Sequence, residues 1–369
     1  MLRMFTAGES HGPALVCILE GMPAGLLVDA NAIDEQLRRR QSGYGRGARQ
    51  QIETDRVRLL GGVFDGRTIG APVAMMVPNR DYENWREREV PPWTRPRPGH
   101  ADLAGALKYG IEDLRLVAER ASARETAARV SAGALARQLL SAAGIAIGSY
   151  VESIGTAHMP EQADPPDRLC GRALLSDVGC PDEATAQAMR AAIDTAREAG
   201  DSLGGTIVVA AWGLMPGLGT HVQWDRRLDG RLAQALMSIQ AIKGIEIGPA
   251  FANASAPGTR VHDALYSGGI RKTNRAGGME GGMTNGEPLW IRLAMKPIPT
   301  TITPIDTIDR ATGEAAATQY QRSDVCAVPA AAVVAEAMAA LVLADALLER
   351  YGGDRVEIIL ERIAHDRKA

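Results

Sequence analysis

The sequence has few cysteines, and their spacing forms no motif. Cys17, Cys170, Cys180 and Cys326 are widely scattered, and none belongs to a CxxC pair. Closely spaced cysteines are the usual sign of a zinc site or a disulfide framework. No pair of histidines has metal-ligand spacing either, so we expect no bound metal. The sequence indicates a reducing compartment.

Aromatic residues and excess positive charge are also scarce. Aromatics make up 4% of the 369 residues, lysine occurs five times, and the formal net charge is -3. Proteins that bind nucleic acid usually carry a basic surface or aromatic side chains on which bases stack. We therefore expect no nucleic-acid partner.

Neither a targeting segment nor a membrane span is indicated. The N-terminal stretch MLRMFTAGES lacks a cationic start followed by an apolar run. The longest apolar tract, Ala327–Leu348, is interrupted by Pro329, Glu336 and Asp345. Such a tract predicts a buried helix rather than a membrane span. We expect a soluble cytoplasmic protein with no membrane partner.

Helical periodicity and runs of β-branched residues alternate along the chain, which is 46% hydrophobic. We expect helices at 125–144, 184–200, 227–244 and 329–350, and strands at 144–155, 205–215 and 287–300. Interleaved helices and strands predict an α/β or α+β fold with an extensive sheet. No low-complexity linker divides the chain, so we expect one large domain over residues 1–369.

Two stretches, GESHG and GDSLG, fit the G-x-S-x-G pattern of a hydrolase nucleophile elbow. An elbow needs a strand before the serine and a helix after it. That order is reversed at Ser202, and a second strand is predicted after Ser10. A serine hydrolase with either serine as nucleophile and His100 or His221 as base is therefore the weaker alternative.

The stretch RRRQSGYGRGARQQ, residues 38–51, contains five arginines and three glycines, and we expect it to form a loop. Its arginines repel one another unless they are solvated or gathered around an anion. Guanidinium groups pair bidentately with phosphate and carboxylate, and glycine lets backbone N–H groups approach the same anion. We weigh a solvated basic face against a site for a small polyanion.

Two histidines, His11 and His100, lie in glycine-flanked loops. Because histidine changes charge near neutral pH, they are the leading candidates for general acids.

Two further stretches allow both a structural and a functional interpretation. Ser122 and Glu125 have the spacing of a capping box, whereas the same helix N-terminus with Arg120 suits a phosphate. Arg322 and Asp324, in RSDVC, predict a salt bridge at the entry of the last long helix.

Eight motifs, taken in order, strongly resemble chorismate synthases over about residues 4–350. They are GESHG, RPGHADLAGALKYG, RASARETAARV, GDSLGG, KGIEIG, TNRAGGMEGGMTNG, KPIPT and RSDVC. The resemblance implies the fold of that family, a β-α-β sandwich of the α+β class with two helical layers between sheets. It also implies assembly as a homotetramer.

Members of that family act in the shikimate pathway, on the way to the aromatic amino acids. They convert 5-enolpyruvylshikimate 3-phosphate to chorismate by an anti-1,4-elimination of phosphate and the C6 proton. The reaction needs reduced FMN although it has no net redox change. A reduced flavin can lend an electron to expel phosphate and recover it as the hydrogen leaves.

The resemblance also implies roles for individual residues. His11 would protonate the departing phosphate, and His100 would protonate or stabilise the reduced flavin near N1. Asp324 would assist proton removal at flavin N5, with Ser10 and Ser122 in the relay. The residues that would hold the substrate phosphate and carboxylates are Arg40, Arg46, Arg49 and Arg97. The resemblance also implies that Arg40 and Arg46 would belong to a site for reduced nicotinamide.

The flavin site implied by the resemblance draws on several motifs. Its residues would be Arg120, Ala121, Ser122, Gln240, Ala241, Gly281, Lys296, Pro297, Ile298, Pro299, Thr300 and Arg322. The sequence has no extra insertion of the kind that would let it reduce its own FMN. We therefore expect NADPH to act only as an external reductant, through a separate flavin reductase.

The sequence departs from the family pattern at RSDVC, where many members have RHDPC. The aspartate is kept, but any help from a histidine beside it is lost. The serine hydrolase and a non-catalytic binder of phosphorylated anions remain as alternatives.

Overall fold

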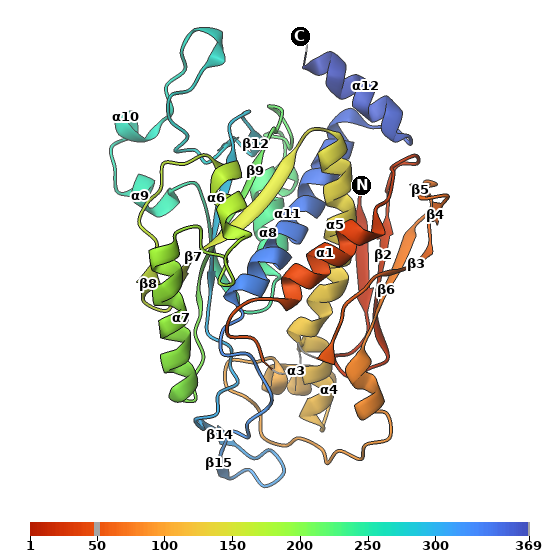
Figure 1. Cartoon of the computed structure of the whole chain (residues 1–369), viewed down its shortest axis with the longest axis vertical. Helices are drawn as coiled ribbons and strands as arrows, with labels where there is room; N and C mark the ends of the chain where they lie inside the picture. The colour runs from red at the N-terminus through yellow and green to blue at the C-terminus, as the bar shows by residue number, and fades with distance from the viewer. Residues whose placement is uncertain (48–51, 368–369) are drawn as a thin grey trace.

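The computed structural model describes residues 1–47 and 52–367 of the chain (Figure 1). A four-stranded antiparallel sheet lies near the N-terminus, with strand order β1-β2-β6-β3. Its strands are β1 (Arg3–Ala7), β2 (Ala14–Glu20), β6 (Val73–Pro78) and β3 (Arg58–Gly61). Along β2, Leu15, Cys17 and Leu19 are buried while the residues between them are more exposed. This alternation turns one face of the sheet toward the core.

The second sheet is antiparallel and has the strand order β10-β13-β9-β7-β8. Its strands are β10 (Ile242–Ile247), β13 (Leu289–Met295), β9 (Gly205–Trp212), β7 (Ala146–Ile154) and β8 (Ala157–His158). The strands predicted at 144–155, 205–215 and 287–300 are thus confirmed with shorter bounds. Strands β7 and β9 are buried over most of their length. The sequence of β9 is accordingly almost entirely apolar, whereas β7 carries Ser149, Glu152 and Ser153, whose side chains are hydrogen-bonded within the fold.

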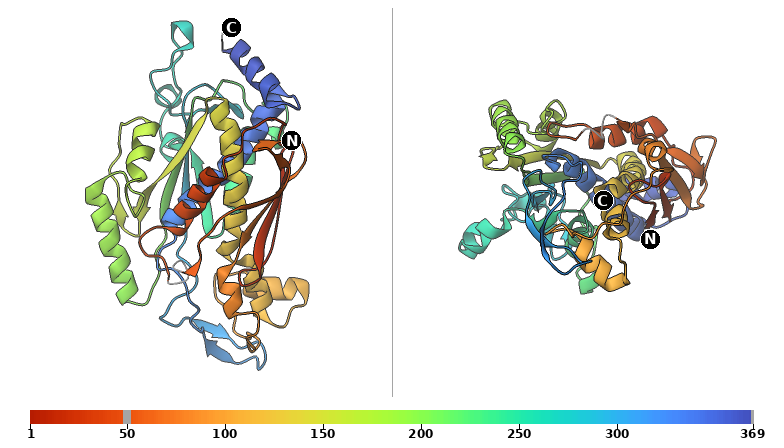
Figure 2. Two further views of the ribbon diagram at one scale, coloured as in Figure 1. Left: turned by 45° about the vertical axis from the view of Figure 1, so that its right-hand side comes forward. Right: turned by 90° about the horizontal axis from the view of Figure 1, so that it is seen from below.

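Helices fill the space between the two sheets, as Figures 1 and 2 show. The main ones are α5 (Thr126–Ala142), α11 (Val328–Tyr351), α1 (Ala30–Gln41) and α8 (Leu228–Met237). Helix α5 packs on β2 and β6, and α11 packs on α5, β7 and β9. The order sheet, helices, sheet confirms the predicted β-α-β sandwich of the α+β class.

Shorter elements surround this framework. The other helices are α3 (Asp102–Tyr109), α4 (Leu114–Ala121), α6 (Pro166–Ala173), α7 (Glu183–Glu198), α9 (Ala250–Ala254), α10 (Gly258–Val261) and α12 (Val356–Asp366). The other strands are β4 (Val63–Phe64), β5 (Arg67–Thr68), β11 (Met279–Glu280), β12 (Met283–Thr284), β14 (Asp306–Ile308) and β15 (Ala315–Ala317). Single 3-10 turns are η1 (Arg80–Asn84), η2 (Ala123–Glu125), η3 (Trp224–Arg226) and η4 (Ser267–Gly269).

Two sequence predictions were wrong in their bounds. The helix predicted at 227–244 ends at Met237, because Ala241 adopts a positive φ of 66° and the chain then pairs as β10 with β13. The loop predicted at 38–51 begins too early, since α1 continues to Gln41. Its buried Leu37 and Arg40 keep that last turn packed against the core.

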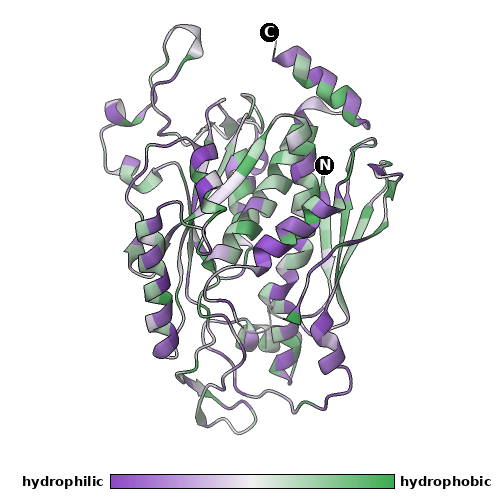
Figure 3. Ribbon diagram, viewed as in Figure 1, coloured by the Kyte–Doolittle hydropathy of each residue, from purple (hydrophilic) through white to green (hydrophobic). Residues whose placement is uncertain are grey.

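Helix α11 is long and apolar enough to cross a membrane, but 89% of its most apolar window is buried in the protein. In Figure 3 it is coloured mostly as hydrophobic and lies between other elements. The carboxylate of its buried Glu336 accepts hydrogen bonds from Arg39, Arg137 and Ser149. The prediction of a buried core helix is confirmed.

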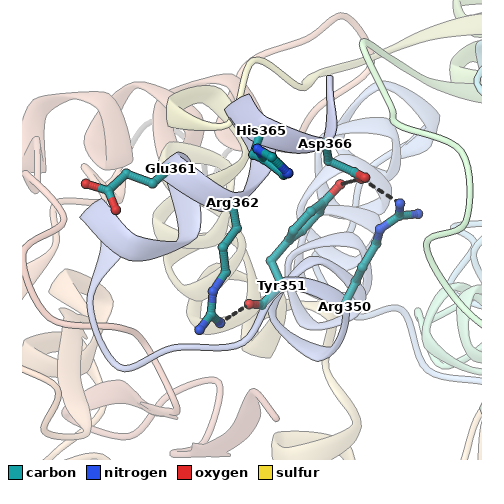
Figure 4. A pocket seen from close by; sticks show the side chains of 6 residues that line it. All are labelled: Arg350, Tyr351, Glu361, Arg362, His365 and Asp366. Atoms are coloured by element: carbon teal, nitrogen blue, oxygen red, sulfur yellow. Dashed lines mark hydrogen bonds and ion pairs between the residues drawn. The ribbon is translucent and has the colours of Figure 1, made fainter. Parts of the chain in front are cut away.

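Helix α12 is fastened to the end of α11 by polar contacts (Figure 4). The Tyr351 hydroxyl and Arg350 both donate to Asp366, over 2.7 and 2.6 Å. Arg362 donates to the backbone carbonyl of Tyr351. A surface pocket of about 430 Å³ lies between the two helices.

We predict that Gly133→Ala destabilises the protein although it lies inside a helix. A Cβ at Gly133 would lie 2.4 Å from the Ala337 Cβ and 2.5 Å from the Ala337 backbone, where α5 meets α11. Overpacking of this kind costs about 1–3 kcal/mol. Gly171→Ala, in α6, is the matched control: nothing lies within 4 Å of its Cβ. There we expect a gain of up to about 1 kcal/mol from helix propensity. Urea unfolding of both variants checks the prediction, and equal effects would contradict it.

Candidate active site

A cavity of about 950 Å³ lies at one end of the helical layers. Thr126 at the start of α5 and Ala327, Ala330, Ala331 and Val334 at the start of α11 line it. Loops from both sheets complete the wall. The predicted site residues on this wall are Ser10, His11, Arg40, Arg46, Arg97, His100, Ala121, Ser122, Gln240, Ala241, Lys296, Ile298, Pro299, Thr300, Arg322 and Asp324.

His11 lies in the tight connection between β1 and β2. Its Nδ1 is 2.6 Å from Glu119 Oε1, and its backbone N–H donates to Glu119 Oε2 over 2.7 Å. The Trp85 ring packs on the imidazole with the ring centroids 4.1 Å apart. Asp81 Oδ2 lies 4.0 Å from His11 Nε2 and also pairs with Arg322, at 3.3 Å. The histidine is therefore held on several sides.

His100 is held by a second carboxylate. Its Nδ1 lies 2.5 Å from Asp102 Oδ1, and Arg97 donates to both oxygens of the same carboxylate over 2.8 and 3.0 Å. Burial alone would raise the pKa of Asp102. The hydrogen bonds from His100 and Arg97 outweigh it and hold that pKa well below its ordinary value. An ionised Asp102 fixes the orientation of both His100 and Arg97.

The arginines of the 38–51 stretch separate in the fold. Arg38 and Arg39 pair with Glu35 and Glu336, away from the cavity, while Arg40 and Arg46 line it. Arg40 is almost completely buried, and burial lowers its pKa to about 9, so it stays cationic at neutral pH. Arg49 lies outside the described residues.

Several polar atoms near the cavity are buried without a hydrogen-bond partner. They include Arg40 Nη1, which lies 3.7 Å from an Asp55 oxygen, and Arg46 Nε. An unsatisfied buried donor costs about 1–3 kcal/mol. A ligand with anionic oxygens would recover that cost, so the described residues favour an anion site over a solvated basic face.

Asp324 contacts Arg46 rather than Arg322. Its carboxylate accepts a hydrogen bond from Gly47 N over 2.6 Å and lies 2.6 Å from Arg46 Nη1. The salt bridge predicted within RSDVC is therefore wrong, because Arg322 turns to Asp81 instead. The contact joins two segments that are far apart in the sequence.

Neither G-x-S-x-G serine stands in a nucleophile elbow. Ser10 follows β1 and precedes β2, and its Oγ lies 3.2 Å from Ser122 Oγ. Ser202 lies between α7 and β9 and donates to the Ile298 carbonyl over 2.7 Å. GDSLG is a turn that supports the KPIPT segment through this hydrogen bond.

The predicted capping box at Ser122 forms only in part. Ser122 Oγ accepts from Arg124 N over 3.2 Å and so caps the 3-10 turn η2. Glu125 does not complete the box, because its carboxylate binds Thr6 and Arg129.

Three predicted flavin residues do not line the cavity within the described structure. Arg120 turns outward and donates to Thr6 O and Gly8 O. Gly281 lies in the β11–β12 turn, and Pro297 does not reach the cavity wall although its neighbours Lys296 and Ile298 line it. The described residues contain no cluster of side chains that could hold a metal ion.

Sequence reasoning missed the residues that hold the two histidines: Glu119, Asp81 and Trp85 at His11, and Asp102 at His100. Asp102 lies two residues after His100, inside the RPGHADLAGALKYG motif. Glu119 immediately precedes the RASARETAARV motif. Asp81 and Trp85 lie in the stretch DYENW, which belongs to none of the eight motifs.

We predict that Asp102→Asn lowers stability in a pH-dependent way. A carboxyl whose pKa is lower in the folded state stabilises the protein above its unfolded-state pKa, and this contribution disappears as the pH falls. The variant should lose roughly 1–3 kcal/mol at pH 7. The difference from wild type should shrink below about pH 4. Urea unfolding between pH 7 and pH 3 measures it, with the exposed Asp225→Asn as control. A difference that does not change with pH would contradict the prediction.

Comparisons with known proteins show the family to which the chain belongs. The chorismate synthase family model matches residues 2–348. Chorismate synthases of Chlorobaculum tepidum and Desulforudis audaxviator are 53% and 54% identical to the chain. The alignments cover 100% and 98% of this chain, and 98% and 96% of those proteins. A crystal structure of chorismate synthase matches with a TM-score of 0.82 at 43% identity, over 100% of this chain and 99% of that chain. Sequence and fold agree over the full length, and the chain belongs to the chorismate synthase family.

Proposed function

We propose that the 950 Å³ cavity binds 5-enolpyruvylshikimate 3-phosphate together with reduced FMN and promotes the elimination that gives chorismate. One observation carries the proposal: His11 and His100, each with a carboxylate at Nδ1, line the same cavity as the incompletely bonded Arg40 and Arg46. Acids and anion-binding groups thus converge on one volume. That volume is at the upper end of the usual range for small-molecule sites.

The described residues fit reduced FMN. Gln240 Oε1 is buried without a hydrogen-bond partner beside the cavity and offers an acceptor to a ring N–H. Lys296 faces the same volume, and burial together with the nearby Lys243 lowers its pKa. We assign the flavin to the wall formed by Ala121, Ser122, Gln240, Ala241 and the KPIPT segment. When bound, it would supply an electron to the breaking carbon–oxygen bond and take it back as the hydrogen leaves.

The substrate anion would meet the arginines that line the same cavity. Arg40, Arg46 and Arg97 line the cavity and would hold the phosphate and carboxylates. Guanidinium groups suit these ligands because their N–H donors match pairs of oxygens. His11 would give a proton to the leaving phosphate from Nε2. Asp324, held by Gly47 N and Arg46, would help to move the proton lost from the ring.

We propose further that the enzyme is cytoplasmic and obtains reduced flavin from a separate reductase. All four cysteines lie in the described residues and are unpaired and buried, as suits a reducing compartment. NADPH alone should then support no turnover.

A homotetramer is supported by the outer face of the N-terminal sheet. Phe5 and Ile18 are paired across β1 and β2 and are 56% and 42% exposed. Val16 and Met76 are paired on neighbouring strands of the same face. An exposed face of a sheet is normally polar. We propose that another copy of the chain covers this one.

We predict activity in an anaerobic assay with chemically reduced FMN and 5-enolpyruvylshikimate 3-phosphate. The assay follows phosphate release and chorismate absorbance. Wild type should turn over. His11→Ala and His100→Ala should each lose about 10²–10⁴-fold in kcat, the usual contribution of a general acid. His158→Ala, exposed on β8, should keep wild-type kcat. Binding of flavin and substrate without turnover would leave the non-catalytic binder. Labelling by a reactive-serine probe would support the hydrolase.

The assembly prediction concerns Ile18. Light scattering should give a tetramer for wild type and a smaller species for Ile18→Lys, because a buried unpaired charge is costly at an apolar interface. Glu20→Gln, on the same strand, should remain tetrameric. A tetrameric Ile18→Lys variant would exclude this face as an interface.

A further inference from the structure

A single carboxylate holds His11 at two points. Glu119, near the end of α4, accepts from the His11 backbone N–H over 2.7 Å, and its other oxygen lies 2.6 Å from His11 Nδ1. Glu119 is separated from His11 by more than a hundred residues, and the Glu119 carbonyl also accepts from Ser10 N over 3.1 Å. The end of α4 therefore fixes both the backbone and the ring of the histidine.

An ionised carboxylate only accepts hydrogen bonds, so the short contact requires a proton on His11 Nδ1. Nε2 is then the ring nitrogen whose proton can be given to a ligand and regained. It lies 4.0 Å from Asp81 Oδ2 and belongs to a side chain that lines the cavity.

Trp85 restricts the remaining freedom of the imidazole. The two rings lie 4.1 Å apart between centroids and are inclined by 34°. The indole is itself held, because its Nε1 donates to Asp81 Oδ2 over 3.2 Å and the Arg88 guanidinium lies 5.1 Å from its ring centroid. Rotation of His11 away from the cavity would have to displace this ring.

We propose that Glu119 and Trp85 are positioning residues that set the tautomer and the direction of His11, so that Nε2 faces the reacting atoms. Glu119 acts through Nδ1 and the backbone, whereas Trp85 acts through the ring face. The inference rests on the proposed function for the role of His11 as an acid, but the tautomer and the ring orientation can be measured without any turnover.

The first experiment is a long-range proton–nitrogen NMR spectrum of the full-length wild-type protein labelled at histidine. His11 signals are assigned by their loss in His11→Ala. At a pH where His11 is neutral, the proton is expected on Nδ1. In Glu119→Gln it should move to Nε2, since the new amide can donate to Nδ1. Glu112→Gln, an exposed neighbour just before α4, should leave the tautomer unchanged.

The second experiment is the anaerobic assay. Glu119→Gln should lose roughly 100-fold in kcat, as expected for a misplaced reacting group, while KM stays unchanged. Glu119→Asp keeps the carboxylate and should recover part of the loss. Trp85→Leu should lower kcat, whereas Trp85→Phe, which keeps a flat ring, should stay close to wild type.

Two results would overturn the proposal: a wild-type His11 with its proton on Nε2, or a folded Glu119→Gln variant with wild-type kcat. If Glu119→Gln does not fold, as judged by its thermal melt, the wild-type spectrum and the two Trp85 variants still decide. If wild type shows the Nδ1 proton but does not turn over, the proposed function fails while the positioning of His11 stands.

Discussion

The close contact between α5 and α11 is the constraint on which the site depends. At Gly133 the two helices approach so closely that Ala337 leaves no space for a Cβ atom. This contact fixes the positions of the N-terminal ends of both helices. Those ends form part of the cavity wall through Thr126 and Ala327. A helix N-terminus carries a partial positive charge, so two converging helices favour an anion before any side chain is considered. The sheets on either side keep the pair from separating.

The arginine side chains around the cavity also favour an anion, but nearby carboxylates neutralise some of them more completely than others. Arg124 is satisfied by Asp55 and Asn79, over 2.7 and 2.8 Å, and therefore supports the wall. Arg40 Nη1 lies 3.7 Å from an oxygen of the same Asp55 and has no hydrogen-bond partner among the described residues. The protein thus neutralises its buried cations only in part and leaves the remaining charge directed at the cavity. A fully paired set would be more stable and would bind an anion less well.

The sequence predicted the long buried elements well and the site in part. Helix α11 and strand β9 are mostly apolar, so their burial follows from their own sequences. The sequence around Ala241 does not predict the end of the helix there, because alanine normally avoids positive φ. The pairing of β10 with β13 imposes this backbone conformation on Ala241. The individual site residues were predicted from the resemblance of motifs to those of a known family, and such motifs identify the groups that contact a ligand. Glu119 and Trp85 touch His11 instead, and only the folded chain brings them to it.

The cavity wall is drawn from residues that run from Ser10 to Val334, and its contacts join distant segments such as Gly47 with Asp324. During translation, the cavity wall is therefore complete only after the first turns of α11 have emerged from the ribosome. Contacts this far apart in sequence are slow to form, because a long loop must be ordered before they contribute. A ligand that contacts both ends of this wall can therefore stabilise the fold only after translation is nearly complete.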